Sequence, residues 1–280
     1  MLPVIFSKKG TFKLDVTESA INFAEIFTKQ LLQILYDGMN WKHYFTSSIG
    51  KKLVMGFTGL FLILFLIVHC YVNAQIFWMD GGVKFDEAAH FMGTNPVIRI
   101  VEIGLVVGFL LHIIQGLMLW AQNSKKRNTR YAVYKTGQTS KWYSRSMGLL
   151  GTLVLLFLIL HTSKFWIPNR ASQFAGNGEL PLYSRMHFAF ENPVVVIIYI
   201  LGCLSLAFHL VHGFYSSFQT LGMGTPKYKK MIRNTGVAFS IIVPLIFALM
   251  PVAFYLNWMP QPQDGWAEGP RTEKTVTVNF

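Results

Sequence analysis

The chain has 280 residues, of which 52% are hydrophobic and only 14% are charged, and its mean hydropathy is +0.39. This composition is far from that of a soluble globular domain and indicates an integral membrane protein. The formal net charge of +12 could suit nucleic acid, but in a membrane protein the basic residues first report topology. We therefore expect no nucleic-acid partner.

The first 46 residues precede any long apolar run, and the apolar start "MLPVIF" is too short for a cleaved signal peptide. Within them, residues 17–37 alternate apolar and charged side chains at helical spacing, which predicts an amphipathic helix lying in the membrane interface. The apolar positions are Ile21, Ala24, Phe27, Leu31 and Ile34.

Five later runs are long and apolar enough to cross a bilayer, since a spanning helix needs roughly 20 such residues. They cover residues 53–76, 97–121, 147–167, 194–217 and 237–256. The sequence thus predicts an all-α fold with a five-helix transmembrane domain at 47–257. A polar external tail is expected at 258–280.

The basic residues are concentrated on one predicted side of the membrane. Of the 25 Lys and Arg, 18 precede the first run, lie between the second and third, or lie between the fourth and fifth. The two internal basic loops contain no acidic residue, whereas the opposite loops carry Asp80, Asp86, Glu87, Glu179 and Glu191. The positive-inside rule then predicts a cytoplasmic N-terminus and a periplasmic C-terminus. The basic loops could bind a soluble partner or anionic lipid.

A sixteen-residue pattern occurs twice, 92 residues apart, and ends each time near a histidine. Both "MGFTGLFLILFLIVHC" and "MGLLGTLVLLFLILHT" fit M-G-x-x-G-x(5)-F-L-I-x-H. The histidines are His69 and His161, each preceded four residues earlier by a phenylalanine, Phe65 or Phe157. The two cysteines, Cys70 and Cys203, form no C-x-x-C motif, so covalently attached haem and disulfides are not indicated.

The second and fourth runs also carry one histidine each, with small residues one turn to either side. These are Gly108 and Gly116 around His112, and Ser205 and Gly213 around His209. Small neighbours would leave room for a flat macrocycle against the helix. His212 also lies on the fourth run but has less suitable neighbours, so it is the alternative to His209.

Helix rise sorts the four histidines by depth. At about 1.5 Å per residue, His69 and His161 lie roughly 25 Å and 24 Å from the cytoplasmic ends of their helices. His112 and His209 lie about 20 Å and 24 Å inward from the outer ends of theirs. We therefore predict two pairs, His69 with His161 near the outer face and His112 with His209 near the inner face.

Each pair suits a haem iron held by two axial imidazoles, a site that transfers electrons and leaves no open position for a substrate. A single intramembrane histidine more often hydrogen-bonds to a neighbouring helix, but four at two depths favour two haems b. A transporter with a histidine proton relay stays open as an alternative. Cytochrome b of quinol:cytochrome c complexes fits poorly, because there two histidines lie on each of two helices.

These motifs resemble the five-helix, di-haem cytochrome b membrane anchor of succinate:quinone oxidoreductases, the succinate dehydrogenase and fumarate reductase family. The similarity spans about residues 47–256 and rests on "TGLFLILFLIVH", "GFLLHIIQG", "LFLILH" and "FHLVHGFYSSFQTLG". It implies that His69, His112, His161 and His209 bind two haems b and that the chain alone catalyses nothing. It also implies a partner flavoprotein with FAD, an iron–sulfur subunit on the cytoplasmic face, menaquinone, and location in a bacterial cytoplasmic membrane. The di-haem cytochrome b of formate dehydrogenases or hydrogenases is the closer alternative, although it typically has four spans.

A quinone site is expected where polar residues gather at a helix end. The outer entrance of the second run supplies Glu87, His90, Asn95, Arg99 and Glu102. Glu102 is the only carboxylate well inside a run, and it could bind quinone, relay protons or be a paired structural group. Arg99 could instead bind a haem propionate, and the loop could simply be solvated.

A weaker candidate set for quinone lies at the inner end, before the first run. It comprises His43, Tyr44, Ser47 and Ser48. A helix cap is at least as good an explanation for either serine.

Overall fold

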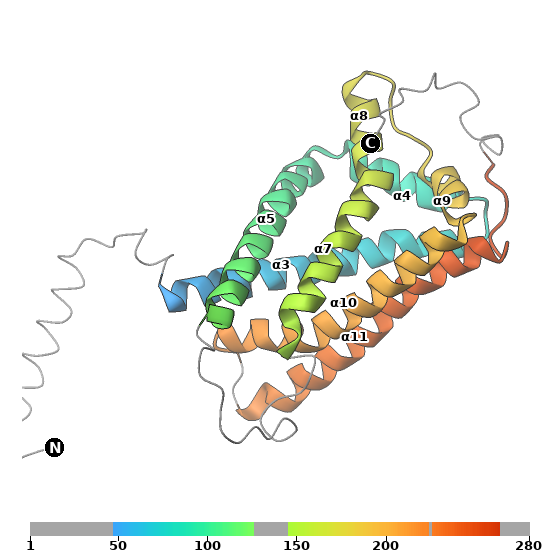
Figure 1. Ribbon diagram of the computed structural model, residues 1–280. Coiled ribbons are helices and arrows are strands. Elements are labelled where there is room, and N and C mark those ends of the chain that lie inside the picture. Colours follow the sequence, from blue (N-terminus) through green and yellow to red (C-terminus); the bar gives the residue numbers. More distant parts are fainter. Residues whose placement is uncertain (1–46, 126–144, 224–225, 264–280) are drawn as a thin grey trace, which may run out of the picture. The chain divides into compact units, whose positions relative to one another are not determined.

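The computed structural model describes residues 47–125, 145–223 and 226–263, and within these ranges all regular structure is helical. The long helices are α3 (Ser48–Ala74), α5 (Pro96–Lys125), α7 (Met147–Lys164), α10 (Pro193–Thr220) and α11 (Pro226–Tyr255). The short ones are η1 (Gln75–Trp78), α4 (Val83–Thr94), α8 (Trp166–Phe174) and α9 (Leu182–Phe190). The chain divides into two units at residue 50, and all these helices belong to the second unit except the first three residues of α3. Figure 1 shows their arrangement. The predicted interfacial helix and most of the tail lie outside the described residues.

Five stretches are long and apolar enough to cross a membrane: Ile49–Trp78, Pro96–Asn123, Met147–Phe174, Pro193–Thr220 and Pro226–Tyr255. The predicted all-α class and the five spans are therefore confirmed. Many large apolar side chains on these helices are exposed, as expected where a helix faces lipid.

Two boundaries differ from the sequence prediction. The fifth helix begins at Pro226 and not near 237, because proline suits the first helical turn and the basic residues after it continue the helix. The third ends at Lys164, and after the non-helical Phe165 (φ −121°, ψ −61°) α8 continues the chain to Phe174.

The second and fourth spans begin with the same local signal. The Asn95 side chain accepts hydrogen bonds from the backbone of Val97 (2.9 Å) and Ile98 (3.3 Å), and Asn192 accepts one from Val194 (2.9 Å). Each asparagine is followed by a proline, Pro96 or Pro193, at the first helical position. An asparagine cap followed by proline fixes where a helix starts. Asn95, considered above for quinone binding, therefore caps α5.

Helix α10 packs along α11 and α7 in the middle of the bundle (Figure 1). Glycines permit this close packing, because a Cβ on Gly202 of α10 would collide with the Phe157 ring of α7, and one on Gly236 of α11 would lie 2.7 Å from the Phe214 ring of α10. Small residues at contacts between membrane helices allow the backbones to approach.

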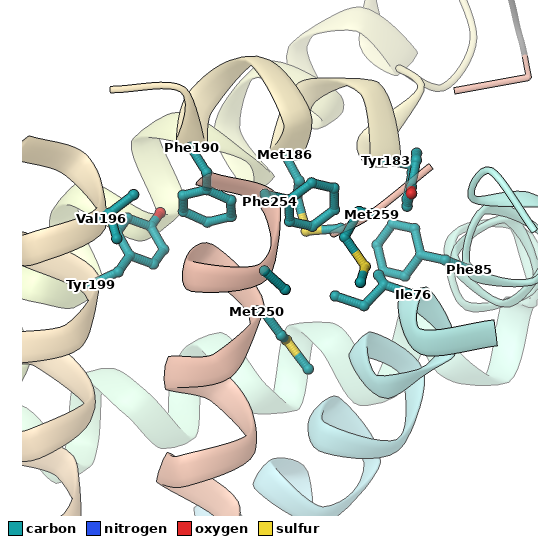
Figure 2. Packing of buried hydrophobic residues seen from close by; sticks show 11 residues of the cluster. Ile76, Phe85, Tyr183, Met186, Phe190, Val196, Tyr199, Met250, Phe254 and Met259 are labelled. Atoms are coloured by element: carbon teal, nitrogen blue, oxygen red, sulfur yellow. The ribbon is translucent and has the colours of Figure 1, made fainter. Parts of the chain in front are cut away.

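A core of buried apolar side chains closes the end of the bundle that we predict to be the outer one, where α4, α9 and the end of α11 meet (Figure 2). Its centre is Tyr183, which is fully buried and donates a hydrogen bond from its hydroxyl to the carbonyl of Pro260 (2.9 Å). Burial, followed by the nearby Asp80 and Asp86, raises the pKa of Tyr183 to about 12, so the hydroxyl stays protonated. Gly82, with φ +94°, lies against the tyrosine ring where a Cβ would not fit. Residues just after α11 thus belong to this core.

Replacing Gly202 by alanine should lower the unfolding temperature, because the new methyl group forces apart α7 and α10. Overpacking of this kind costs about 1–3 kcal/mol. The matched control is Gly104→Ala on α5, where a Cβ meets nothing within 4 Å, and it should leave stability unchanged or slightly raised. Thermal unfolding in detergent, followed by circular dichroism, distinguishes the two. Equal behaviour of both variants would contradict the close packing at Gly202.

Candidate functional site

The inner predicted histidine pair comes together between α5 and α10. The ring centres of His112 and His209 lie 6.3 Å apart, with an angle of 66° between the ring planes. The Nδ1 atom of His209 is buried and has no hydrogen-bond partner among the described residues. Two helices that run in the same direction, the second and fourth spans, therefore present imidazoles to each other at one depth.

The outer pair comes together between α3 and α7. The ring centres of His69 and His161 lie 5.9 Å apart, with the planes at 90°. The phenylalanine four residues earlier stacks on each ring, Phe65 on His69 at 5.1 Å and Phe157 on His161 at 5.7 Å. Tyr199 of α10 lies edge-on to His161 at 5.9 Å, so aromatic rings surround the outer pair.

The spacing of both pairs fits a metal held between imidazoles. Metal bonds to imidazole nitrogen are about 2 Å long, so two rings coordinating one metal have centres about 6 Å apart. The measured 5.9 Å and 6.3 Å match this spacing. Neutral imidazole is also a common axial ligand of haem iron. The residues present therefore fit two haem groups, each bound from both sides.

The repeated M-G-x-x-G motif has a matching place in both halves of the bundle. A Cβ on Gly59 of α3 would lie 3.6 Å from the Cε1 atom of His112, and one on Gly151 of α7 would lie 3.7 Å from the Cε1 atom of His209. In each half, the second glycine of the motif thus lies against the imidazole on the following span. Each copy of the motif therefore contributes to both pairs. Its second glycine lies against a histidine of the inner pair, and its own histidine belongs to the outer pair.

The observed starts of α5 and α10, each at an asparagine–proline pair, give a more precise reference for the depth of His112 and His209 than the helix ends assumed in the sequence analysis. His112 follows Pro96 by 16 residues, and His209 follows Pro193 by 16 residues, which is about 24 Å along either helix. Position 115, which corresponds in this register to His212, is a glutamine. The register therefore favours His209 over His212 as the partner of His112.

The small residues beside the inner histidines do not all leave open space. A Cβ on Gly213 would meet nothing within 4 Å, as expected, but one on Gly108 would lie 3.1 Å from the Phe61 ring, and one on Gly116 would lie 3.4 Å from the Met55 side chain. Gly108 and Gly116 therefore allow side chains of α3 to approach α5. The expectation of free space holds at Gly213.

Glu102 is a paired group at the outer end of α5. Its carboxylate accepts hydrogen bonds from Trp166 Nε1 (2.7 Å) and from the Nε and Nη2 atoms of Arg170 (2.8 and 2.7 Å). Arg99 adds a longer contact at 3.3 Å. The side chains of Glu102 and Arg170 are only 19% and 13% exposed, so two opposite charges satisfy each other where water is scarce.

Hydrogen bonds continue from this pair to the surface through Gln173 of α8. Its side-chain oxygen accepts from Arg99 (2.8 Å) and from Arg170, and its amide nitrogen donates to Glu179 (2.9 Å). The other oxygen of Glu179 lies 2.8 Å from His90 Nδ1. We call this chain of polar side chains the outer network: His90, Arg99, Glu102, Trp166, Arg170, Gln173 and Glu179.

The sequence analysis missed the half of the outer network that lies after the third span. An intramembrane carboxylate needs a partner, and Arg170, just beyond the predicted third run, was available. The helical continuation as α8, which brings Arg170 to Glu102, was not expected. Among the other candidates, Glu87 is exposed on α4, and Ser47 accepts a hydrogen bond from the Gly50 backbone (3.0 Å), as a helix cap does. His43 and Tyr44 lie outside the described residues, and the Ser48 side chain is likewise not described.

A cavity of about 410 Å³ opens beside the outer network. Asp86 and His90 of α4, Asn169 of α8, Glu179 in the segment before α9 and Leu182 at the start of α9 are among the residues that line it. Its walls combine carboxylates, an imidazole and apolar side chains. Such a mixture can position a small molecule that has both polar and apolar parts.

Among curated proteins, the chain is similar to the succinate dehydrogenase cytochrome b558 subunit of Bacillus subtilis (strain 168). The two are 26% identical over 193 residues, which cover 68% of this chain and 88% of the relative. No protein-family model and no solved structure matches the chain. Together with the five spanning helices, this similarity confirms the resemblance predicted from the sequence motifs. The chain is thus a multi-pass protein of the cytoplasmic membrane that is similar to the cytochrome b subunit of succinate dehydrogenase.

Proposed function

We propose that this chain is the membrane-anchor subunit of a succinate dehydrogenase or fumarate reductase and carries electrons between an iron–sulfur subunit and membrane quinone. The observation that carries the proposal is the presence of two histidine pairs, 5.9 and 6.3 Å between ring centres, one between the first and third spans and one between the second and fourth. The chain alone catalyses no reaction. A partner flavoprotein with FAD performs the chemistry on succinate or fumarate.

The four histidines each have one task in this proposal. His112 and His209 hold the inner haem b, and His69 and His161 hold the outer one. When bound, each haem supplies one-electron transfer. With an imidazole of this chain bound from either side, each iron would have no position for a substrate, and the surrounding apolar side chains would exclude water.

The proposed orientation follows the distribution of charge. The starts of α3, α7 and α11 carry or follow basic residues, such as Lys52, Arg145 and Lys227, and alternating helices bring these starts to one face. By the positive-inside rule this face is cytoplasmic, and it receives the iron–sulfur subunit. The inner histidine pair then lies closer to the electron donor than the outer pair.

We propose the outer network and its cavity as the quinone contact, with menaquinone as the expected quinone. The cavity volume of about 410 Å³ is within the range of small-molecule sites. His90 lines the cavity, is 67% exposed and pairs with Glu179, so the polar wall of the cavity reaches the protein surface. Glu102, and Glu87 on the same face as His90, are less favoured as direct contacts. Two guanidinium nitrogens of Arg99 donate to Glu102 and Gln173, and its other N–H groups could bind a haem propionate.

Haem content tests the ligand assignment. The purified complex, reduced with dithionite, should show two haems b per chain, because each pair holds one. His112→Ala should retain only one, since a single imidazole from His209 binds the inner iron weakly. The absorbance of the reduced protein per chain measures both.

Two control variants sharpen this test. His90→Ala removes an exposed histidine far from either pair and should retain both haems, and His212→Ala should do so if His209 is the ligand. A colourless wild-type complex would exclude the proposal and favour a transporter, which shows no Soret band. Loss of the inner haem in His212→Ala but not in a His209→Ala variant would reassign the ligand.

Replacing Arg170 by glutamine should destabilise the outer end, because it leaves the poorly exposed Glu102 carboxylate without two hydrogen bonds and its main counter-charge. Losing hydrogen bonds to a charged group costs about 1.5–3 kcal/mol. Adding Glu102→Gln to that variant should restore part of the stability, since no unpaired charge then remains. Thermal unfolding measures each variant. His90→Gln, at the exposed end of the network, is the control and should change stability by less than about 0.5 kcal/mol. A double variant less stable than Arg170→Gln alone would contradict the assigned ion pair.

A further inference from the structure

The two copies of the M-G-x-x-G motif differ at the position before the second glycine. The first copy has Thr58 on α3, and the second has Leu150 on α7. The following glycines, Gly59 and Gly151, lie against His112 and His209 at nearly the same distance. A threonine therefore lies beside one histidine of the inner pair, and a leucine takes the equivalent position in the other half.

The Thr58 hydroxyl is placed to accept a hydrogen bond from His112. Its hydrogen is used by the helix backbone, because Thr58 Oγ1 donates to the carbonyl of Val54 at 2.8 Å. The same oxygen lies 3.2 Å from His112 Nδ1, so the lone pairs of the hydroxyl face the ring nitrogen. Under this arrangement Nδ1 carries the hydrogen of His112, and Nε2 keeps the lone pair that can bind a metal.

The other three histidines of the two pairs lack an equivalent acceptor in the described part of the chain. The Nδ1 atoms of His209 and His161 are buried without a partner. Near His69 Nδ1 lies the amide nitrogen of Asn73, at 3.3 Å, which also donates to the His69 carbonyl at 2.8 Å. That nitrogen is a donor and cannot accept a proton from the ring. His112 is therefore the histidine whose ring hydrogen is engaged by an oxygen.

We propose that Thr58 is a positioning residue that fixes the tautomer of His112 and lowers the reduction potential of the inner haem. The inference rests on the proposed binding of that haem by His112. A hydrogen bond from Nδ1 increases the electron density at Nε2, as carboxylate or carbonyl partners do for other metal-bound histidines. A stronger donor stabilises ferric iron more than ferrous iron, so the one-electron reduction becomes less favourable.

Replacing Thr58 by valine removes the hydroxyl and keeps the shape of the side chain. At a fixed applied potential, the ratio of reduced to oxidised inner haem should rise roughly threefold to tenfold, which is about 30–60 mV for a one-electron couple. The outer haem should be unchanged. Spectroscopic redox titration of the purified complex measures both, and the spectrum of His112→Ala identifies the inner component by its loss.

Three further variants separate the hydrogen bond from general packing. Thr58→Ser keeps the hydroxyl and should titrate like the wild type. Thr152→Val removes a hydroxyl on α7 that bonds only to the Gly148 carbonyl, and it should have no effect. Leu150→Thr offers His209 the acceptor that it lacks, so the reduced fraction of the inner haem should fall.

The outcomes separate this inference from the proposed function. A wild-type complex without two haems overturns the proposed function. Two haems with an unchanged inner potential in Thr58→Val overturn the role of Thr58 and leave the haem ligands intact. If Thr58→Val does not yield folded complex, Leu150→Thr decides: a lower reduced fraction supports the role of this motif position, and no change overturns it.

Discussion

The structure depends on one constraint, which is that imidazoles buried in an apolar bundle must lie beside suitable partners. A polar ring inside a membrane protein needs a partner, and four of the five imidazoles on the spans lie in two pairs. The pairing requires that two helices running in the same direction carry their histidines at the same distance from their starts. The asparagine–proline caps meet this requirement, because both place a histidine 16 residues after the helix start. The local caps at the starts of two helices thus determine that two histidines far apart in the sequence lie at the same depth.

The first four spans form two similar halves, which differ at a few positions beside the histidines. In each half, a helix with M-G-x-x-G precedes a helix with an asparagine–proline start. The glycine of the first helix lies against the histidine of the second in both halves. Thr58 and Leu150 break the similarity beside the inner pair. Two sites built from one pattern can therefore have different chemical properties through single side chains, while the backbone positions stay alike.

Much of the fold could be predicted from the sequence, because hydrophobic length and helical rise are local properties. They gave the five spans and the depth of each histidine, and hence which rings would face each other; their binding to haem is still a prediction. The ion pair of Glu102 with Arg170 could not be predicted in the same way. It depends on α8 continuing beyond the third span. Pro168 in the first turn of α8 indicates the break at Phe165, but it does not predict where the new helix places Arg170. The start of the fifth helix at Pro226 could not be predicted from the apolar run alone, because the basic residues of its first turns read as part of a loop.

The outer network shows how charge is accommodated where the apolar spans end. Glu102 on α5 is close enough to the apolar region that water satisfies it poorly, and Arg170 and Trp166 provide the missing donors. Gln173 and Glu179 extend the bonds to His90, which is exposed. The same side chains that neutralise a buried carboxylate therefore form a continuous polar connection to the outer surface. Arg170 therefore supplies a counter-charge, and together with Trp166 hydrogen-bond donors, at a depth where water supplies few.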